Sequence, residues 1–333
     1  MELKESPRPT SGHQEIVGVV HYGLGPIGKA VADLVRERPG LRSVAAVDPD
    51  PQLQGQRLGH VQIAPRLTSD LLGSAAIAIH CTSSSLSRVA PQLLELVGAG
   101  LNVVSTCEEL SFPWAAEPRL SAELDAAAKA KGVSILGTGV NPGYAMDYLP
   151  IVLSGVARSI DRVRVTRVQD ASTRRLPLQR KVGAGLTVSE FERRVAEGSL
   201  GHVGLRQSID ALAAAFGWQI DEYEEATTPV PAPKAVSSGV GEIAPGDVLG
   251  LHQVATGQSD GHKVVELDLT MAIGMPDPAD RIELFGSPNL ELLIPGGLHG
   301  DVATASIVVN AIRRVVDSAP GLRVMSELAP PHP

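Results

Sequence analysis

Six consecutive residues near the amino end constrain the fold more than any other segment of the chain. They are Gly23, Leu24, Gly25, Pro26, Ile27 and Gly28. They follow an apolar run at residues 16–21, which predicts a buried strand, and they open a stretch at 26–36 with helical spacing of apolar residues. The first glycine of such a turn permits a tight bend, the second lets a ligand approach the backbone, and the third lets helix and strand pack closely. This arrangement predicts the first unit of a Rossmann sheet that binds a dinucleotide at the six residues.

The next acidic residue bears on which dinucleotide binds. Asp48 lies 20 residues after Gly28, at the end of a second apolar run at 43–48. A carboxylate at this place accepts hydrogen bonds from the ribose hydroxyls of NAD(H), although Asp48 also suits a simple turn before Pro49. Its charge opposes the 2′-phosphate of NADP(H), but Arg57 offers a compensating charge. We therefore expect NAD(H) and/or NADP(H) as the cofactor.

The pattern of apolar residues predicts an α/β fold that begins with an N-terminal Rossmann domain, a doubly wound parallel sheet. Strands are expected at residues 16–21, 43–48, 75–81, 102–105 and 133–136, with helices at 26–36, 85–97 and 116–131. These strands are apolar almost throughout, as is usual when helices cover both faces of a parallel sheet. We assign residues 1–150 to this domain.

Beyond residue 150 the pattern changes to strands that alternate apolar and polar residues. Strands are expected at 162–168, 248–256, 264–273 and 290–294, with helices at 191–196, 205–216 and 302–316. Such alternation is typical of antiparallel sheets with one exposed face. We assign residues 151–300 to a second α+β domain, built on a mainly antiparallel sheet, that binds substrate and forms a homodimer through the apolar face of that sheet. A C-terminal helix within about 301–330 is expected to pack back on the first domain.

Composition excludes several classes of protein. The net charge is −8 and no long basic run is present, apart from a short cluster at residues 174–181, so no nucleic-acid partner is expected. No apolar stretch is long enough for a membrane helix, and residues 1–14 are polar, so we expect no membrane association and a cytoplasmic location. The two cysteines, Cys81 and Cys107, are read as small buried residues, and the nine histidines lack ligand spacing, so no metal is expected.

Polar residues follow the expected strands at the edge of the sheet where ligands bind. Thr82, Ser83 and Ser84 come after the third strand and predict cofactor contacts, although they also suit a helix N-cap. Glu108 and Glu109 follow the next strand. A carboxylate beside the nicotinamide end of a cofactor can exchange a proton with an amine and stabilise an iminium, although Glu-Glu is also a common solvated helix start.

The loop after the last Rossmann strand is a second candidate for cofactor contact. Asn141 and Pro142 lie in this Gly-rich loop, at residues 137–143, which can bring an amide against the nicotinamide. The same Asn-Pro-Gly sequence also makes an ordinary turn.

Taken together, these segments resemble the family of 2,4-diaminopentanoate dehydrogenases and the related native amine dehydrogenases. The resemblance extends from Tyr22 to Leu328 and rests on the order of residues 105–110, 137–144 with Met146 and Asp147, 170–172, 181–185, 201–205, Gly297, 299–301 and Asn310. It implies NAD(P)H-dependent reductive amination of small ketones or aldehydes with ammonia to primary amines, and the reverse oxidative deamination. It also implies that Glu108 is the acid–base residue.

The resemblance implies further contacts around the reacting groups. Asn141, Pro142 and Asn310 are expected at the cofactor, and the residues expected at the substrate are Tyr144, Ala145, Thr173, Leu176 and His202. The small Ala145 would leave room for a longer or branched ketone. His202 would bind substrate or orient Glu108, although a lone histidine is more often structural.

Two other functions stay open at this point. An imine reductase of the dihydrodipicolinate reductase type would need a His-His pair followed by Lys in the second domain, and the chain lacks one. A non-catalytic NAD(P)-sensing protein would bind the cofactor without turnover. A sugar or polyol dehydrogenase, which carries Glu-Lys-Pro after the corresponding strand, is disfavoured because Glu109 and Leu110 follow Glu108 and the lysine base is absent.

Overall fold

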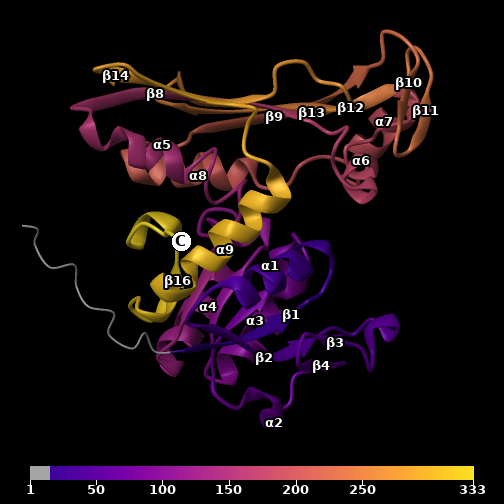
Figure 1. Ribbon diagram of the computed structural model, residues 1–333. Coiled ribbons are helices and arrows are strands. Elements are labelled where there is room, and N and C mark those ends of the chain that lie inside the picture. Colours follow the sequence, from indigo (N-terminus) through magenta and orange to yellow (C-terminus); the bar gives the residue numbers. More distant parts are fainter. Residues whose placement is uncertain (1–15) are drawn as a thin grey trace, which may run out of the picture.

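The computed structural model describes residues 16–333, so the polar leader at residues 1–14 lies outside it. Figure 1 shows two layers, a sheet wrapped by helices and a second, longer sheet, with helix α9 (Gly300–Val316) between them. The chain passes from the first layer to the second after residue 137 and returns through the segment that leads into α9. Within residues 16–333, no helix is both long and apolar enough to cross a membrane.

The first sheet has eight strands in the order β16-β7-β6-β5-β1-β2-β4-β3. They are β1 (Val17–Tyr22), β2 (Leu41–Val47), β3 (Arg57–Leu58), β4 (Val61–Ala64), β5 (Ala75–His80), β6 (Asn102–Ser105), β7 (Ser134–Gly137) and β16 (Gly321–Arg323). All neighbours are parallel except the short β3 and β4. The Rossmann expectation is confirmed.

Helices cover both faces of this sheet. They are α1 (Pro26–Glu37), α2 (Ser69–Leu72), α3 (Leu86–Gly98), α4 (Pro118–Lys131) and α9, accompanied by short 3-10 turns η1 (Pro51–Leu53), η2 (Glu108–Leu110) and η4 (Met325–Glu327). On one face Val31 of α1 and Ile312 of α9 share a core cluster with strand residues. On the other face Leu93 of α3 and Leu124 of α4 share a second cluster. Packing on both sides explains why the strands carry few polar residues.

The second sheet has six strands in the order β15-β14-β8-β13-β12-β9. They are β8 (Ser159–Asp170), β9 (Glu222–Pro231), β12 (Val248–Ser259), β13 (His262–Ala272), β14 (Ala279–Ser287) and β15 (Leu290–Pro295), and β10 (Val236–Ser238) pairs separately with β11 (Gly241–Ile243). The mainly antiparallel expectation is confirmed, with one correction: β8 and β13 are parallel neighbours. Parallel neighbours need a crossover connection, which residues 171–261 supply.

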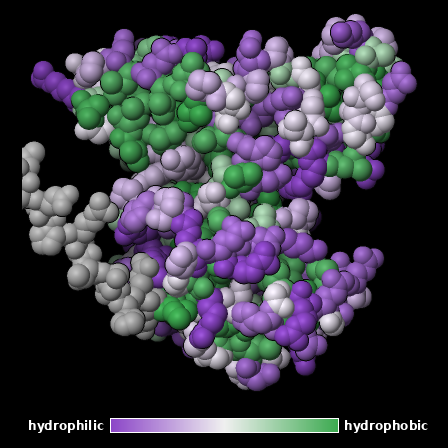
Figure 2. All heavy atoms as spheres, viewed as in Figure 1, coloured by the Kyte–Doolittle hydropathy of each residue, from purple (hydrophilic) through white to green (hydrophobic). Residues whose placement is uncertain are grey.

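Helices pack under one face of the second sheet. They are α5 (Tyr148–Leu153), α6 (Leu176–Lys181), α7 (Val188–Ala196) and α8 (Leu205–Phe216), with a 3-10 turn η3 (Ser154–Val156) after α5. Figure 2 shows a hydrophobic patch at the end of this layer that carries α5, where Val152 and Val156 are 51% and 77% exposed. The homodimer stays a prediction. Exposed apolar patches of this kind are common at protein–protein interfaces, so this patch is a further candidate for the dimer contact.

Candidate functional site

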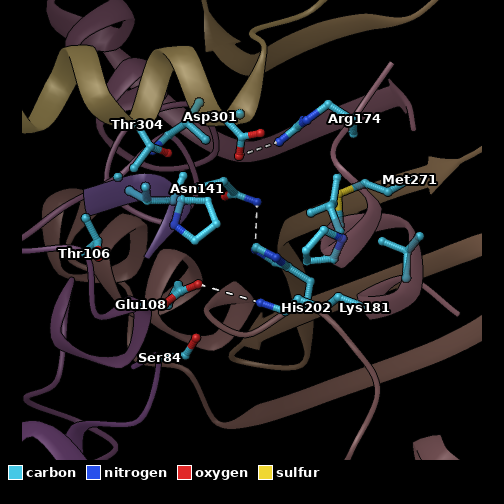
Figure 3. Close-up of a pocket in the computed structure, with 18 of the residues that line it drawn as sticks. Ser84, Thr106, Glu108, Asn141, Arg174, Lys181, His202, Met271, Asp301 and Thr304 are labelled. Atoms are coloured by element: carbon cyan, nitrogen blue, oxygen red, sulfur yellow. Dashed lines mark hydrogen bonds and ion pairs between the residues drawn. The ribbon is translucent and has the colours of Figure 1, made fainter. Parts of the chain in front are cut away.

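A cavity of about 410 Å³ lies between the two layers. Its floor is formed by the loops that follow β1, β5, β6 and β7, and its other walls by β8, α6, β12, β13 and the first turn of α9. The carboxyl edge of a parallel sheet is where ligands bind in folds of this kind. Figure 3 shows how side chains from both layers converge on this space.

The glycine turn after β1 uses its three glycines for different purposes. Gly23 has φ of +92°, and a methyl group on Gly28 would lie 2.0 Å from the carbonyl oxygen of Gly23. Both therefore serve the tight packing of strand and helix. Gly25 is different, because a methyl group there would meet no atom within 4 Å, and the residue borders the cavity together with Pro26 and Ile27. The open space over Gly25, at the N-terminus of α1, fits a phosphate-bearing cofactor.

Asp48 holds the glycine turn in place. The amide of Leu24 donates to its Oδ2 at 2.6 Å, and the amide of Asp50 donates to its Oδ1 at 2.9 Å. Leu24 itself is buried and packs with Ala46 and Val61. The structure therefore gives Asp48 a turn-forming role, one of the two roles weighed from the sequence. Each oxygen keeps a lone pair for a ribose hydroxyl, so the cofactor contact stays a prediction.

Thr82, Ser83 and Ser84 line the cavity. The Thr82 hydroxyl lies 2.9 Å from Nε2 of His80 and donates to Oε1 of Gln92 at 2.8 Å. His80 is buried, and burial lowers its pKa. The N-cap of α3 is the next residue of the same run, Ser85, whose side chain makes no capping hydrogen bond within the described residues.

Two adjacent carboxylates have separate roles. Oε2 of Glu109 accepts a hydrogen bond from the amide of Leu86 at 2.6 Å, so this residue satisfies the first turn of α3. Glu108 lines the cavity, with a side chain that is 23% exposed and an Oε1 atom 4.0 Å from Nζ of Lys181. Lys181 belongs to α6, so this ion pair joins the two layers across the cavity (Figure 3). Only Glu108 is placed to act on a ligand.

Asn141 and His202 meet on the cavity wall. The Asn141 amide nitrogen lies 3.1 Å from Nε2 of His202, and the buried Oδ1 of Asn141 has no hydrogen-bond partner within residues 16–333. The backbone of His202 is fixed by Gln253, whose Oε1 accepts from the His202 amide at 2.7 Å and whose Nε2 donates to the His202 carbonyl at 2.9 Å. Because an amide nitrogen only donates, Nε2 of His202 accepts and the ring carries its proton on Nδ1. Asn141, a residue of the cavity wall, thus keeps a buried acceptor without a hydrogen-bond partner among the described residues.

The pKa of His202 predicts a pH effect on stability. Burial, with the charges of Lys181 and Arg167, lowers this pKa from 6.5 to about 3. The unfolded chain therefore binds a proton below pH 6.5 that the folded chain refuses, and stability is lost as the pH falls from 6.5 towards 3. For this residue we expect a loss of about 2 kcal/mol between pH 7 and pH 5.

Urea unfolding at both pH values measures this effect. His202→Asn should reduce the difference in unfolding free energy by about 2 kcal/mol, since it removes the titrating group. His21, whose pKa burial lowers to about 4, titrates in the same window in both proteins and cancels from the comparison. An unchanged difference in the variant would show that His202 is not held neutral.

Of the eight residues that the resemblance implies at the cofactor or the substrate, five do not line the cavity, among the residues that the structure describes. They are Tyr144, Ala145, Thr173, Leu176 and Asn310. Oδ1 of Asn310 accepts from Arg38 at 3.1 Å, and Thr173 is exposed. Tyr144 packs at the edge of the first core, 6.1 Å from the ring of Tyr148.

The expectation that Ala145 lines the substrate pocket departs furthest from the structure. Ala145 is 1% exposed and belongs to the core beneath the second sheet, with Val140 and Leu205. Buried Asp147 causes this, because it accepts hydrogen bonds from the Gly143 amide at 2.7 Å and the Ser208 hydroxyl at 2.8 Å, which draws the loop towards α8. A larger side chain at residue 145 would overpack this core and lower stability, so the residue does not test pocket size.

Sequence reasoning missed a charged group on the cavity wall. Arg174 and Asp301 form an ion pair at 3.1 Å, and Arg175 joins the same carboxylate at 3.4 Å. The sequence contains both parts of this group, the basic cluster at residues 174–181 and Asp301 near the end of the resemblance. Nothing in the sequence indicates that the two are in contact.

The chain was compared with known proteins. The family described as "2,4-diaminopentanoate dehydrogenase C-terminal domain" matches residues 144–333. A 2,4-diaminopentanoate dehydrogenase from Acetoanaerobium sticklandii is 30% identical over 96% of this chain and 95% of the relative. An amine dehydrogenase from Streptomyces virginiae is 25% identical over 92% and 94% of the two chains. The solved structure of an amine dehydrogenase from Mycobacterium smegmatis has a TM-score of 0.83 and 29% identity, over 96% of this chain and 98% of that one.

Proposed function

Because the chain belongs to the 2,4-diaminopentanoate dehydrogenase family and is an NAD(P)-dependent oxidoreductase acting on CH–NH2 donors, we propose that it aminates small ketones or aldehydes with ammonia and catalyses the reverse deamination. The observation that carries this proposal is the position of Glu108. Its carboxylate borders the cavity at the carboxyl edge of the sheet, while the adjacent Glu109 is bound to α3.

The residues proposed to hold the cofactor line the same cavity. The open backbone at Gly25, with Pro26 and Ile27 in the first turn of α1, would take the pyrophosphate, and Thr82 and Ser84 would extend that contact. When bound, the dinucleotide supplies the hydride for reduction and accepts it in oxidation. Asn141, with its unpaired Oδ1, would orient an N–H donor of the cofactor or the substrate.

Glu108 would move the protons that the reaction needs. In the oxidative direction, a primary ammonium, NAD(P)+ and water give a ketone, ammonium, NAD(P)H and one proton. The C–H bond breaks with loss of hydride, and water then adds to the resulting iminium carbon. Glu108 would remove a proton from the substrate ammonium before hydride loss and release it to solvent. It would then take a proton from the water that attacks the iminium and pass it to the nitrogen of the carbinolamine, whose C–N bond breaks to give the ketone and ammonium. In the reverse direction it would protonate the hydroxyl that leaves the carbinolamine.

A spectrophotometric assay tests this function. Purified protein is mixed with NADH or NADPH, ammonium chloride and a panel of small ketones and aldehydes, and the loss of absorbance of the reduced cofactor is followed. We expect turnover that requires both ammonium and a carbonyl compound. Turnover of preformed cyclic imines without ammonium would favour an imine reductase instead. Tight NADH binding without turnover on any carbonyl compound would contradict the proposal and leave a nucleotide-binding protein.

A further inference from the structure

A buried histidine ends β5, directly before the loop that borders the cavity. His80 is the last residue of that strand, and its neighbour in the sheet is Ser105, the last residue of β6. Both residues are buried, and both stand at the carboxyl edge of the sheet. Gln92 of α3 reaches the same place from the covering helix. None of these three side chains belongs to the cavity lining within residues 16–333.

Both ring nitrogens of His80 have hydrogen-bond partners. Nδ1 lies 2.9 Å from the hydroxyl oxygen of Ser105, and Nε2 lies 2.8 Å from Oε1 of Gln92. A carboxamide oxygen only accepts, so Nε2 carries the ring proton, and Nδ1 accepts the proton of the Ser105 hydroxyl. The ring is therefore an acceptor on one side and a donor on the other.

The acceptor side of the ring leads to Glu108. Because the Ser105 hydroxyl gives its proton to His80, its oxygen is oriented to accept, and the Cys107 amide donates to it at 3.1 Å. Cys107 immediately precedes Glu108, so this bond fixes the direction in which the Glu108 side chain leaves the backbone. Figure 3 shows Glu108 reaching from this segment towards Lys181 on the opposite wall.

The donor side of the ring leads to the loop proposed to contact the cofactor. The Thr82 hydroxyl donates to Oε1 of Gln92 at 2.8 Å, and its oxygen lies 2.9 Å from Nε2 of His80. The hydroxyl proton is thus used within the protein, and the ring N–H occupies one of the two lone pairs. Thr82 lines the cavity, so its second lone pair is left for a donor of the cofactor, such as a ribose hydroxyl.

Packing alone does not call for a histidine at this position. Ala78, two residues earlier on the same face of β5, packs in an apolar cluster with Leu93 of α3. A buried imidazole costs free energy unless its polar atoms are bonded. Within the described residues, no buried polar atom of His80, Ser105 or Gln92 lacks a partner. The network is therefore complete, and each of its two arms ends beside the cavity.

We propose that His80 is a positioning residue for both partners in the reaction. Its Nδ1 atom fixes, through Ser105, the backbone that carries Glu108. Its Nε2–H group fixes, together with Gln92, the Thr82 hydroxyl that meets the cofactor. This inference rests on the proposed function and deepens it, because it names the residue that sets the acid–base group and the cofactor relative to each other. A misplacement of a reacting group by about 1 Å can lower a rate by about 100-fold.

Two substitutions separate the arms, since the side-chain amide of asparagine reaches the place of Nδ1 and that of glutamine the place of Nε2. His80→Gln keeps a donor for Gln92 and loses the acceptor for Ser105. The assay uses saturating NADH and ammonium chloride, with the ketone of the panel that wild type aminates fastest. We expect kcat to fall by about 30-fold. The Kd for NADH, from a fluorescence titration, should stay within about threefold of wild type.

His80→Asn should give the opposite result. It keeps an acceptor for Ser105 and loses the donor to Gln92 and Thr82. The Kd for NADH should rise by about tenfold, the effect of about one hydrogen bond. At saturating NADH, kcat should fall by less than about threefold. A merely structural role would not separate the two constants in this way, because each variant removes one bond of the same buried ring.

His21 provides a matched control. It is buried in the neighbouring strand β1, its Nε2 lies 2.8 Å from the Ser43 hydroxyl, and it does not line the cavity. His21→Asn removes a comparable buried bond, so we expect a lower Tm with kcat and Kd within about twofold of wild type.

Hydrogen–deuterium exchange gives a readout that needs no turnover. The Cys107 amide should exchange at least about fivefold faster in His80→Gln than in wild type, because its acceptor Ser105 is no longer held. In His80→Asn the rate should stay within about twofold of wild type. Ser105→Ala removes the same arm without changing the ring, so it should repeat both results of His80→Gln even if the His80 variants do not fold.

Three results would overturn the positioning role. The first is a parallel change of kcat and Kd in the two His80 variants. The second is wild-type kcat in a folded His80→Gln or Ser105→Ala protein. The third is the same loss of activity in His21→Asn, which would assign the effect to general destabilisation of the sheet. If wild type aminates no ketone, the proposed function fails, and the NADH titrations with the exchange of the Cys107 amide still decide whether His80 holds the two arms.

Discussion

Replacing Glu108 by Gln is expected to lower kcat for reductive amination by about 10³-fold. Glutamine keeps the size of the side chain and can still meet Lys181, which lies 4.0 Å from the carboxylate. It cannot exchange a proton with the amine, the attacking water or the leaving hydroxyl. The affinity for NADH should change by less than about twofold, since the glycine turn lies elsewhere on the floor of the cavity. Steady-state kinetics and a fluorescence titration with NADH measure the two effects separately.

Glu109→Gln is the matched control for this experiment. The two glutamates are adjacent in η2, but the Glu109 carboxylate accepts from the Leu86 amide at 2.6 Å and does not line the cavity. Its kcat should stay within about threefold of wild type, while the free energy of unfolding should fall by about 1 kcal/mol through the weakened cap. A larger loss of activity in Glu109→Gln than in Glu108→Gln would show that Glu109, and not Glu108, is the acid–base residue.

The first sheet could be predicted from the sequence because local pattern and final environment agree there. The run at 102–105 has two buried valines between Asn102 and Ser105 and becomes β6 (Asn102–Ser105) with the same limits. The glycine turn was equally clear, since its spacing and its position after a strand are both local features. The residue pattern placed Glu108 and Glu109 at the edge of the sheet but did not tell them apart, and the family resemblance pointed to Glu108. Their difference depends on the Leu86 amide, which lies more than 20 residues away in the chain.

The second sheet was predicted less completely, for physical reasons. β9 (Glu222–Pro231) carries a Glu-rich beginning and two prolines, because it is an edge strand whose residues are mostly exposed. β16 (Gly321–Arg323) has three residues and forms only by pairing with β7, so the chain after α9 does not continue as a helix. Such strands are specified by their neighbours and not by their own sequence.

The charged wall of the cavity shows the same limit. Arg174 and Asp301 are separated by 127 residues in the sequence and meet only because α9 returns from the second layer to the first. Composition marked the cluster at 174–181 as unusual in an acidic chain, but not its partner. The sequence suits Asp48 to a cofactor contact and to a turn, and its hydrogen bond from the Leu24 amide depends on how tightly the turn folds. Contacts of this kind depend on the tertiary fold, so local sequence does not predict them.

Replacing Gly25 by Val is expected to raise the Kd for NADH by about 100-fold or more while leaving the protein folded. Gly25 has φ of −61° and ψ of −177°, a conformation open to any residue, so the backbone does not require glycine there. Packing does not require it either, because a methyl group would meet no atom of the described part of the chain within 4 Å. The remaining reason for glycine at the N-terminus of α1 is a ligand that comes close to the backbone. A fluorescence titration gives the Kd, and thermal unfolding without cofactor should give a Tm within about 2 °C of wild type.

Gly28→Ala is the contrasting variant, because the same motif predicts the opposite pair of results. A methyl group on Gly28 would lie 2.0 Å from the carbonyl oxygen of Gly23, so α1 must move away from β1, at a cost on the order of 3 kcal/mol. Thermal unfolding without cofactor should therefore show a lower Tm for Gly28→Ala. Gly25→Val should change only the Kd for NADH measured in the titration. Wild-type affinity in Gly25→Val would mean that the cofactor does not approach this backbone. The space over Gly25 would then have no role in binding it.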